Sequence, residues 1–376
     1  NTQEYMQIDN FSFTSLEIFK NIEGDIKGSL ISVLDHTNTS MGARLLRDFL
    51  KFPLLDIENI SYRQNLVYLL TKNLDILNEI RVYLSEIQDA ERAQSRISAN
   101  TNNPRDLIII LNFIDKSNEI FKILDGNKEK TLKNLTAKSS QRKQLLNLKE
   151  LIERTIVFNP PNIITNGDII NDGVDNLLDK YRNIKNEKKR EIVDLQLKYA
   201  ELTKINNLKI KFNNIHGYFV EVNNKNANKI SENSDLKFNM VQNTVNASRF
   251  QTEKLVNISK EINESELKAL ELEKKIYSNV CLEIKKLSDK IDTFSNKIAF
   301  IDVITNFAYT AKTNNYVKPN LEKEPKTIEI EDGRHPVIEE SLKREASQYI
   351  TNNCSMNKNE NLWLMTGPNM AGKSTF

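Results

Sequence analysis

Glycine and proline are scarce in this sequence, at 10 and 8 of 376 residues. Because these residues break regular structure most strongly, their scarcity favours long helices. Only two cysteines occur, Cys281 and Cys354, and their spacing matches neither a zinc site nor a disulfide framework. No secretory apolar region and no apolar run long enough to cross a bilayer is found, so we expect a cytoplasmic protein without membrane contact.

The sequence also lacks a large excess of positive or negative charge. The chain has 53 Lys and Arg against 51 Asp and Glu, for a net charge of +2. No global basic field therefore indicates nucleic acid, and any DNA contact must come from local clusters of basic side chains. The length suits two or three domains with a sizeable core.

Apolar residues recur at helical spacing over most of the chain. Residues 40–100 follow this pattern with a break at Phe52-Pro53, and residues 104–155 continue it. A long helix is predicted over 174–205, where the charged run 185–190 indicates a solvated face. Another is predicted over about 255–308, with an apolar seam that includes Ile291, Phe294, Ile298 and Ile301.

A β-rich module separates these two long helices. Residues 209–223 alternate and are rich in β-branched and aromatic side chains. Ile210, Phe212 and Ile215 are predicted to share one face, and Tyr218, Val220 and Val222 another, with a bend at Gly217. The simplest arrangement is an antiparallel helix pair, each helix reaching roughly 45 Å, with the module at its tip. A plain coiled-coil spacer is the alternative interpretation of the helical pattern.

The composition changes again near residues 319–333, where Pro319, Pro325 and Gly333 indicate a domain boundary. A short strand is predicted at 327–330. The apolar run at 361–365 is predicted to be a buried strand that leads directly into a glycine-containing loop.

That loop is the most specific feature of the chain. It fits the phosphate-binding pattern G-x-x-x-x-G-K-[ST] with Gly367, Pro368, Asn369, Met370, Ala371, Gly372, Lys373 and Ser374. The two glycines let the backbone curve around a phosphate, and Lys373 would reach the β- and γ-phosphates. The Ser374 hydroxyl would bind Mg²⁺. No Ser-His-Asp or metal-ligand constellation accompanies it, and His36, His216 and His335 are interpreted as structural.

The stretch TGPNMAGKST (366–375) closely resembles the ATP loop of the MutS mismatch-repair family, with Ala371 where that family usually has glycine. The resemblance extends over nearly the whole chain. It includes residues 30–56, 89–107, 212–222 and 332–340, in the family's order. Five separated matches are more specific than the phosphate loop alone.

The resemblance implies a mainly α fold: a long-helix core and lever domain, an inserted β-rich clamp at the helix tips, and the truncated start of an α/β P-loop ATPase domain. We expect the core and lever at 1–204 and 255–322, the clamp at 205–254 and the ATPase start at 323–376. The chain is expected to be a fragment. The acidic strand that positions Mg²⁺ and water would follow Phe376, so no catalytic residue is expected here, and the fragment alone should not hydrolyse ATP.

Site residues follow from the same resemblance. Residues Gly367 to Thr375 should bind ATP together with Tyr349, which would stack on the adenine, and Ile350, which would contact it through the backbone. The clamp should contact the DNA backbone, and its basic residues are the candidates: Lys209, Lys211, Lys225, Lys229, Lys237, Arg249 and Lys254. Val241 and Asn243 stand where the family usually has Arg and Thr, which puts one DNA contact in doubt.

The expected function is ATP-dependent binding of mismatched double-stranded DNA by a homodimer that signals to a downstream repair partner at the nucleoid. The mismatch-reading domain of the family precedes this region and is not included in it. Three alternatives stay open: a MutS-family paralogue that acts in recombination, a chromosome-organising coiled-coil ATPase, and a non-enzymatic helical scaffold. The coiled-coil ATPases carry their phosphate loop before the coil, whereas here it follows, and a scaffold leaves the loop unexplained.

Overall fold

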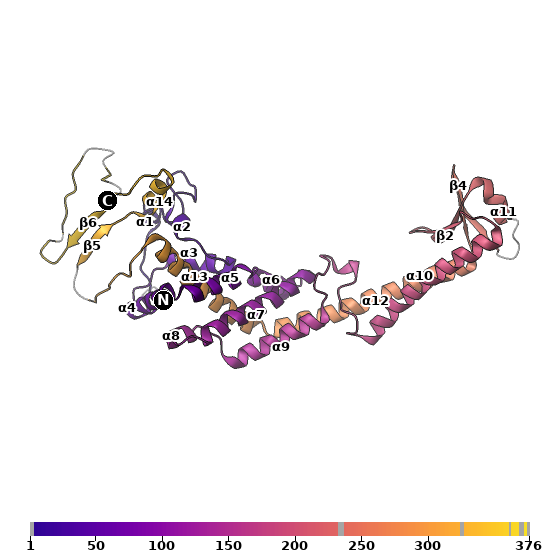
Figure 1. The fold of residues 1–376 in the computed structure, drawn as a ribbon, viewed down its shortest axis with the longest axis horizontal. Coiled ribbons are helices and arrows are strands. Elements are labelled where there is room, and N and C mark those ends of the chain that lie inside the picture. The colour runs from indigo at the N-terminus through magenta and orange to yellow at the C-terminus, as the bar shows by residue number, and fades with distance from the viewer. Residues whose placement is uncertain (1–3, 232–236, 324–326, 361, 368–371, 374–376) are drawn as a thin grey trace. The chain divides into compact units, whose positions relative to one another are not determined.

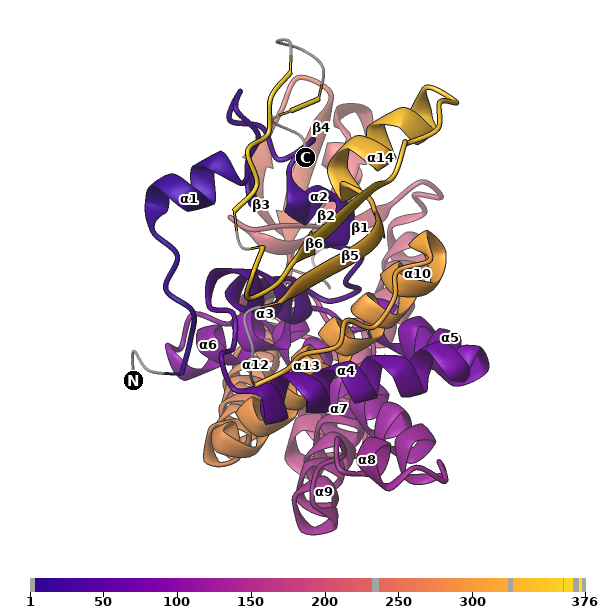
Figure 2. The same cartoon turned by 90° about the vertical axis from the view of Figure 1, so that its left-hand side faces the viewer.

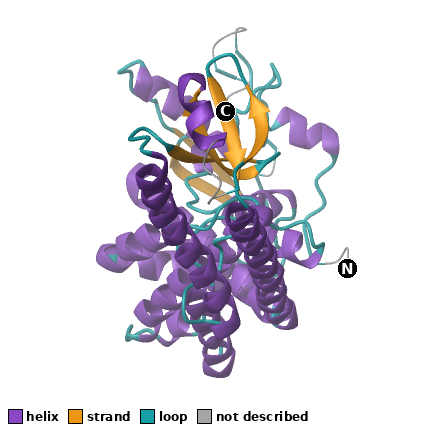
Figure 3. Ribbon diagram, turned by 90° about the vertical axis from the view of Figure 1, so that its right-hand side faces the viewer, coloured by secondary structure: helices purple, strands orange, loops and turns teal. Residues whose placement is uncertain are grey.

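The computed structural model describes residues 4–231, 237–323, 327–360, 362–367 and 372–373. Helices make up most of the described chain, and strands form a small antiparallel sheet and one two-stranded pair (Figures 1 and 3). This confirms the predicted mainly α class. The chain divides into two compact units, one of residues 1–99, 109–149 and 286–376, the other of residues 100–108 and 150–285. Each unit is described by itself below.

The first unit is a helical assembly followed by a short β pair. Its helices are α1 (Asn10–Ser15), α2 (Leu30–Leu34), α3 (Ser40–Lys51), α4 (Ile57–Lys72), α5 (Leu74–Ser85), α6 (Ala90–Ser98), α8 (Lys130–Lys133), α13 (Ser288–Asn314) and α14 (Pro336–Arg344), with most of α7 (Pro104–Asp125) and α9 (Ser139–Thr155). The break predicted at Phe52-Pro53 is confirmed, because Phe52 caps α3 and α4 begins at Ile57.

Helix α13 is the centre of this unit. It packs against α3, α4 and α5, and its predicted seam residues Ile291, Phe294, Ile298 and Ile301 are all buried. The predicted single helix over 255–308 is wrong, because α12 (Glu253–Lys286) ends before α13 begins. The interruption is at Leu287 (φ −107°, ψ 13°), where the chain passes from one unit to the other. Neither glycine nor proline indicates this break in the sequence.

Strands β5 (Ile328–Gly333) and β6 (Asn352–Met356) pair antiparallel, with α14 between them in sequence (Figure 2). The strand predicted at 327–330 is confirmed, but it begins one residue later and ends three residues later, at Gly333. The buried strand predicted at 361–365 is wrong: residues 362–365 form no strand, and Leu362 and Leu364 are 82% and 87% exposed. An apolar run becomes a buried strand only beside strands that accept its hydrogen bonds, and no described strand pairs with this run.

The second unit contains a long helix pair, α10 (Asn176–Thr203) and α12, with a four-stranded sheet between them in sequence (Figure 1). The strands are β1 (Lys209–Asn213), β2 (Gly217–Asn223), β3 (Asn239–Asn243) and β4 (Ala247–Gln251), joined in part by η2 (Asn224–Asn226) and α11 (Ala227–Ser231); η1 (Ile164–Asn166) precedes the pair. The helix predicted at 174–205 and the β module after it are confirmed.

The sheet has strand order β1-β2-β4-β3, and all its pairs are antiparallel. Its inner face packs on the adjoining ends of α10 and α12, in a core that includes Val220, Val222, Phe250, Leu195 and Ile258. The prediction of two separate apolar faces is wrong. Ile210 lies opposite Val220 and Phe212 opposite Tyr218, and cross-strand partners point to the same face.

Ile215 is not part of either predicted face. It lies in the turn between β1 and β2 and is 85% exposed. The Asn213 side chain accepts hydrogen bonds from the backbone N–H groups of Ile215 and His216, which closes this turn. Local side-chain hydrogen bonding of this kind favours a turn over continued strand.

Candidate functional site

The structure brings five of the predicted ATP-binding residues around one cavity of about 570 Å³ in the first unit. These are Tyr349, Ile350, Gly367, Gly372 and Lys373. Six further residues complete the lining, namely Ile338, Leu342, Gln348, Asn352, Met365 and Thr366. Because the sequence predicts that these residues bind ATP, we call this cavity the nucleotide pocket. Its volume lies within the usual range for small-molecule sites.

Helix α14 forms one wall of the nucleotide pocket. His335 caps the helix, since its Nδ1 accepts the Ile338 N–H at 3.4 Å, and Pro336 occupies the first turn, where its missing N–H costs nothing. The helix then presents Ile338 and Leu342 to the cavity. Neither residue is among the predicted ATP-binding residues, although their spacing of four places them on one helix face.

Arg334 fixes the start of α14. Its guanidinium donates to the Glu339 carboxylate at 2.8 Å and to the carbonyls of Asn314 and Asn315 at 3.0 and 3.1 Å. Those carbonyls belong to the C-terminus of α13, where a cation is favoured by the helix dipole. Arg334 therefore ties the wall of the nucleotide pocket to the central helix of the same unit. No local sequence pattern indicates this role of Arg334.

The described part of the phosphate loop suits an anion. Gly372 has φ +82°, a conformation that L side chains rarely adopt, and no atom of the described residues lies within 4 Å of the place where a Cβ would stand at Gly367 or Gly372. The cavity thus combines an aromatic ring and aliphatic side chains, which can contact a flat apolar group, with a lysine beside two glycines, which can contact an anion. Six other predicted binding residues lie outside the described residues: Pro368, Asn369, Met370, Ala371, Ser374 and Thr375. The predicted Mg²⁺ contact of Ser374 lies there too.

Three of the seven basic residues predicted to bind DNA are already ion-paired. Lys211 Nζ and Arg249 Nε contact the two carboxylate oxygens of Glu221, at 2.6 and 3.0 Å. Lys254 Nζ contacts Glu191 at 3.0 Å. Lys211 above all, and Arg249 after it, hold the pKa of Glu221 below its ordinary value, because both stabilise the charged carboxylate.

The other four, Lys209, Lys225, Lys229 and Lys237, are exposed, and none has an ion-pair partner among the residues that the structure describes. Lys209 lies on β1, Lys225 on η2 and Lys229 on α11, whereas Lys237 follows the undescribed residues 232–236. The seven residues therefore come from different parts of the module.

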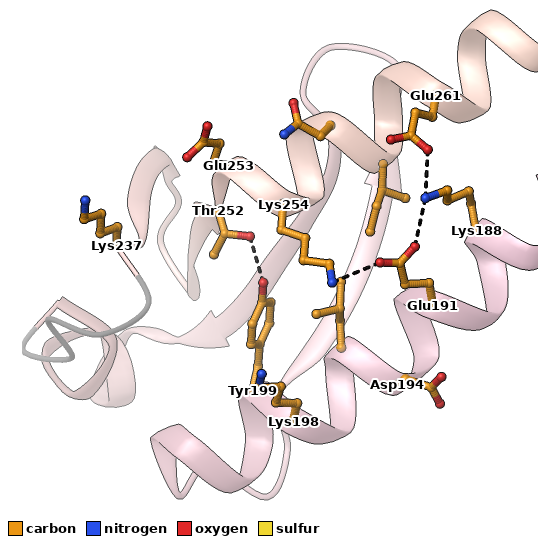
Figure 4. A pocket seen from close by; sticks show the side chains of 13 residues that line it. Lys188, Glu191, Asp194, Lys198, Tyr199, Lys237, Thr252, Glu253, Lys254 and Glu261 are labelled. Atoms are coloured by element: carbon orange, nitrogen blue, oxygen red, sulfur yellow. Dashed lines mark hydrogen bonds and ion pairs between the residues drawn. The ribbon is translucent and has the colours of Figure 1, made fainter.

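A hollow of about 700 Å³ lies between α10 and α12 beside the sheet, and Lys237 and Lys254 line it (Figure 4). Two ion pairs cross from one helix to the other there, Lys254 with Glu191 and Lys188 with Glu261, and Lys188 also contacts Glu191 within α10. Four lysines and four acidic residues share the lining, so the hollow carries no net charge. Because the charges cancel, the hollow should attract a polyanion such as DNA only weakly.

A buried ion pair lies farther along the same helix pair. Arg182 Nη2 of α10 contacts Glu273 Oε1 of α12 at 2.6 Å, and Glu273 is 2% exposed. The second carboxylate oxygen of Glu273 accepts the Ile169 N–H at 3.2 Å. This contact joins both helices to the segment before α10, and nothing in the sequence pattern had indicated it.

Two absences hold for the described part of the chain. No group of three or more His, Cys, Asp or Glu side chains there is arranged to hold a metal ion. No described helix combines the length and apolar character that crossing a bilayer would need.

Comparison with known proteins gives consistent matches. A family model described as MutS domain III matches residues 12–308. The chain is 37% identical over 380 residues to the DNA mismatch repair protein MutS of Rickettsia bellii (strain OSU 85-389), which covers 99% of the chain. It is 35% identical over 384 residues to the protein of that name from Rickettsia rickettsii (strain Sheila Smith), and 33% over 384 residues to that of Rickettsia prowazekii (strain Madrid E); both matches cover 100% of the chain.

These matches cover 42% of each of those relatives. The chain thus spans about two fifths of the length of the curated relatives that it matches.

Proposed function

The chain belongs to the MutS family, and on that premise we propose that it is the central part of an ATP-dependent DNA mismatch-repair protein. In this proposal residues 1–204 and 255–322 form the core and lever, 205–254 the clamp, and 323–376 the start of a P-loop ATPase domain. The intact protein would act as a homodimer on mismatched double-stranded DNA at the nucleoid and signal to a downstream repair partner.

The observation that carries the nucleotide part is the convergence of Tyr349, Ile350, Gly367, Gly372 and Lys373 around one cavity. In this proposal the Tyr349 ring stacks on the adenine, and the Ile350 backbone contacts the base. Lys373 neutralises phosphate charge beside the backbone N–H groups of the glycine-containing loop. Ser374 would hold Mg²⁺, which when bound would supply positive charge that stabilises the phosphates.

The clamp part rests on charge and position. Residues 205–254 carry seven basic and four acidic side chains, a local excess in a chain that is nearly neutral overall. The module joins α10 to α12, so a change in the helix pair would move it. Contacts of lysine and arginine with phosphates position a protein on DNA without reading its sequence, which suits a clamp.

Mismatch repair is favoured over the alternatives by the family match and by the names of the relatives. They are called DNA mismatch repair proteins, and the matches run over nearly all of this chain. A recombination paralogue or a chromosome-organising coiled-coil ATPase finds no support in these comparisons. For ATP to drive release from DNA, it must bind the gripping and releasing states with different affinities.

The decisive experiment replaces Lys373 by alanine in the full-length protein. We expect K373A to bind DNA as the wild type does but to lose ATP-driven release, measured by filter binding with and without ATP. The matched control is Lys358→Ala, which removes an exposed lysine of the same unit outside the nucleotide pocket. Normal ATP-driven release by K373A would refute the proposal.

A further inference from the structure

The sheet of the second unit has a polar face opposite the one that packs on α10 and α12. Strand alternation places Lys209, Lys211, Phe219, Glu221 and Arg249 on it, and Gln242 of β3 pairs with Arg249. We call these six residues the outer face. It has three basic side chains and one acidic side chain, in contrast to the balanced hollow between α10 and α12.

The carboxylate of Glu221 lies between two cations on this face. Its Oε1 accepts from Lys211 Nζ at 2.6 Å, and its Oε2 accepts from Arg249 Nε at 3.0 Å. An oxyanion held at these distances by a lysine on one side and an arginine on the other has the surroundings that proteins give to a phosphate. The structure therefore contains a formed anion site whose occupant is a side chain of the same sheet.

Arg249 is held in place by more than its ion pair. Its Nη1 donates to the Gln242 side chain at 2.7 Å, and its guanidinium lies 4.9 Å from the ring centroid of Phe219. Phe219 is only 2% exposed, so the ring is a fixed support for the cation. The Arg249 Nη2 has no acceptor among the described residues, which leaves N–H groups available to a ligand.

The cations of the outer face can be reached from solvent. The side chains of Lys211 and Arg249 are 51% and 26% exposed. Lys209 lies opposite Glu221 in the β1–β2 register, is exposed and has no described partner. Lys209 and Lys211 lie on β1 and Arg249 on β4, with Glu221 of β2 between the two strands, so a phosphate chain that crosses this face would meet cations on both sides of β2.

We propose that the outer face is a binding site for the phosphodiester backbone of DNA, and that Glu221 occupies the position of one phosphate while DNA is absent. The proposal rests on the proposed DNA clamp and adds a specific set of contacts and a built-in competitor. Glu221 keeps Lys211 and Arg249 extended and ordered, which lowers the cost of arranging them on binding. It also lowers affinity, because an incoming phosphate must displace a carboxylate that stays nearby.

The test compares the 376-residue chain with its Glu221→Gln variant in binding a labelled random-sequence DNA duplex across a series of salt concentrations. We expect E221Q to bind roughly threefold to tenfold more tightly near 0.1 M salt. Its slope of log affinity against log salt should be steeper by about 0.9 for each additional phosphate neutralised. Thermal unfolding followed by circular dichroism checks that the variant is folded.

The matched control is Glu253→Gln, which changes the net charge equally, in the same part of the chain. Glu253 is exposed, lies off the outer face and has no described ion-pair partner. If the proposal is right, E253Q stays close to the wild type. A second variant, Lys211→Gln, leaves the Arg249 pair intact and should weaken DNA binding, and the double variant E221Q/K211Q should bind less tightly than E221Q.

The outcomes separate this proposal from the general function. If the wild type binds DNA and E221Q gains no more than E253Q, the outer-face assignment is wrong and the clamp proposal stands. If K211Q binds as the wild type does, the assignment is wrong as well, even where E221Q fails to fold. If no variant binds duplex DNA at low salt, the clamp proposal itself fails, and the outer-face assignment fails with it.

Discussion

The buried carboxylate of Asp302 in α13 accepts hydrogen bonds from both the backbone N–H and the hydroxyl of Thr39, at 2.8 and 2.7 Å. Thr39 is the N-cap of α3, and its Oγ1 accepts the Gly42 N–H at 2.9 Å. The start of α3 is thus fixed by a residue 263 positions away in the sequence. Burial raises the pKa of Asp302, because it disfavours the charged carboxylate.

Any side chain larger than that of glycine at position 42 should destabilise this arrangement. A Cβ at this position would overlap the Asp302 carboxylate, with the Asp302 Cγ only 2.7 Å away. We expect Gly42→Ala to destabilise the first unit by about 2 kcal/mol or more, because overpacking outweighs the better helix propensity of alanine. Urea unfolding measures this. Gly126→Ala is the control, since a Cβ there meets no atom closer than 3.5 Å, and equal stability of both variants would contradict the prediction.

The effects of substituting Arg182 and Glu273 on the free energy of unfolding should not be additive. Glu273→Ala removes the buried carboxylate and leaves the largely buried Arg182 charge with the exposed Asp172 carboxylate and the Ile170 carbonyl, and we expect a cost of about 3–5 kcal/mol. Replacing both residues, by Arg182→Met and Glu273→Leu, should recover much of this loss, because no unpaired charge is then buried. A double-mutant cycle of unfolding free energies measures the coupling; additive effects would show that the pair is not coupled.

A pH dependence is expected from Glu191 in the hollow between α10 and α12 (Figure 4). Lys254 first and Lys188 second hold the pKa of Glu191 below its ordinary 4.5. A depressed carboxyl pKa means that the stabilisation is fully present above the unfolded pKa and is lost as the pH falls through the folded pKa. Because these side chains are partly exposed, the contribution is at most about 1 kcal/mol.

The measurement is the stability difference between the wild type and Glu191→Gln from pH 3 to pH 7. The difference should be constant above about pH 5 and shrink in more acidic solution. Glu253→Gln, which removes a carboxylate without a described partner, should show no comparable trend. A Glu191→Gln difference that grows on acidification would mean that the ion pairs do not stabilise the helix pair.

Tyr349 should contribute to nucleotide affinity through its ring. We expect Tyr349→Ala to weaken binding of a fluorescent ATP analogue to the full-length protein by about 1–3 kcal/mol, the usual range for stacking of a base on an aromatic side chain. Tyr349→Phe keeps the ring and should retain affinity. If Tyr349→Phe lowers the affinity as much as Tyr349→Ala does, the hydroxyl rather than ring stacking accounts for the contribution of Tyr349 to nucleotide binding.

Periodicity predicted the long helices well, because their apolar faces repeat over many turns. Helix α10 and the seam of α13 follow directly from such spacing. The break at Leu287 could not be predicted, since no residue there disfavours helix and the interruption falls where the chain changes units. The run at 361–365 was predicted as a strand that the structure does not form. Its composition suits a strand, but strand formation depends on neighbouring strands that the run itself does not specify.

In the candidate site, too, the sequence predicted residues that form a local motif but not residues whose roles depend on distant partners. The loop residues Gly367, Gly372 and Lys373 carry a local pattern, so the sequence alone located them. The roles of Arg334 and Glu221 depend on partners from other elements. Only the strand register shows that the DNA-binding candidates Lys211 and Arg249 meet on one carboxylate.

The division of the chain into units also determines the order in which they can be completed during synthesis. The second unit ends at residue 285, whereas the first receives its central helix only when α13 leaves the ribosome. Until then α3, α4 and α5 lack the surface that covers their apolar faces, and Thr39 lacks its carboxylate partner. A nascent chain that stalls before α13 begins at Ser288 therefore exposes apolar surface on these three helices, and we expect chaperones to bind it.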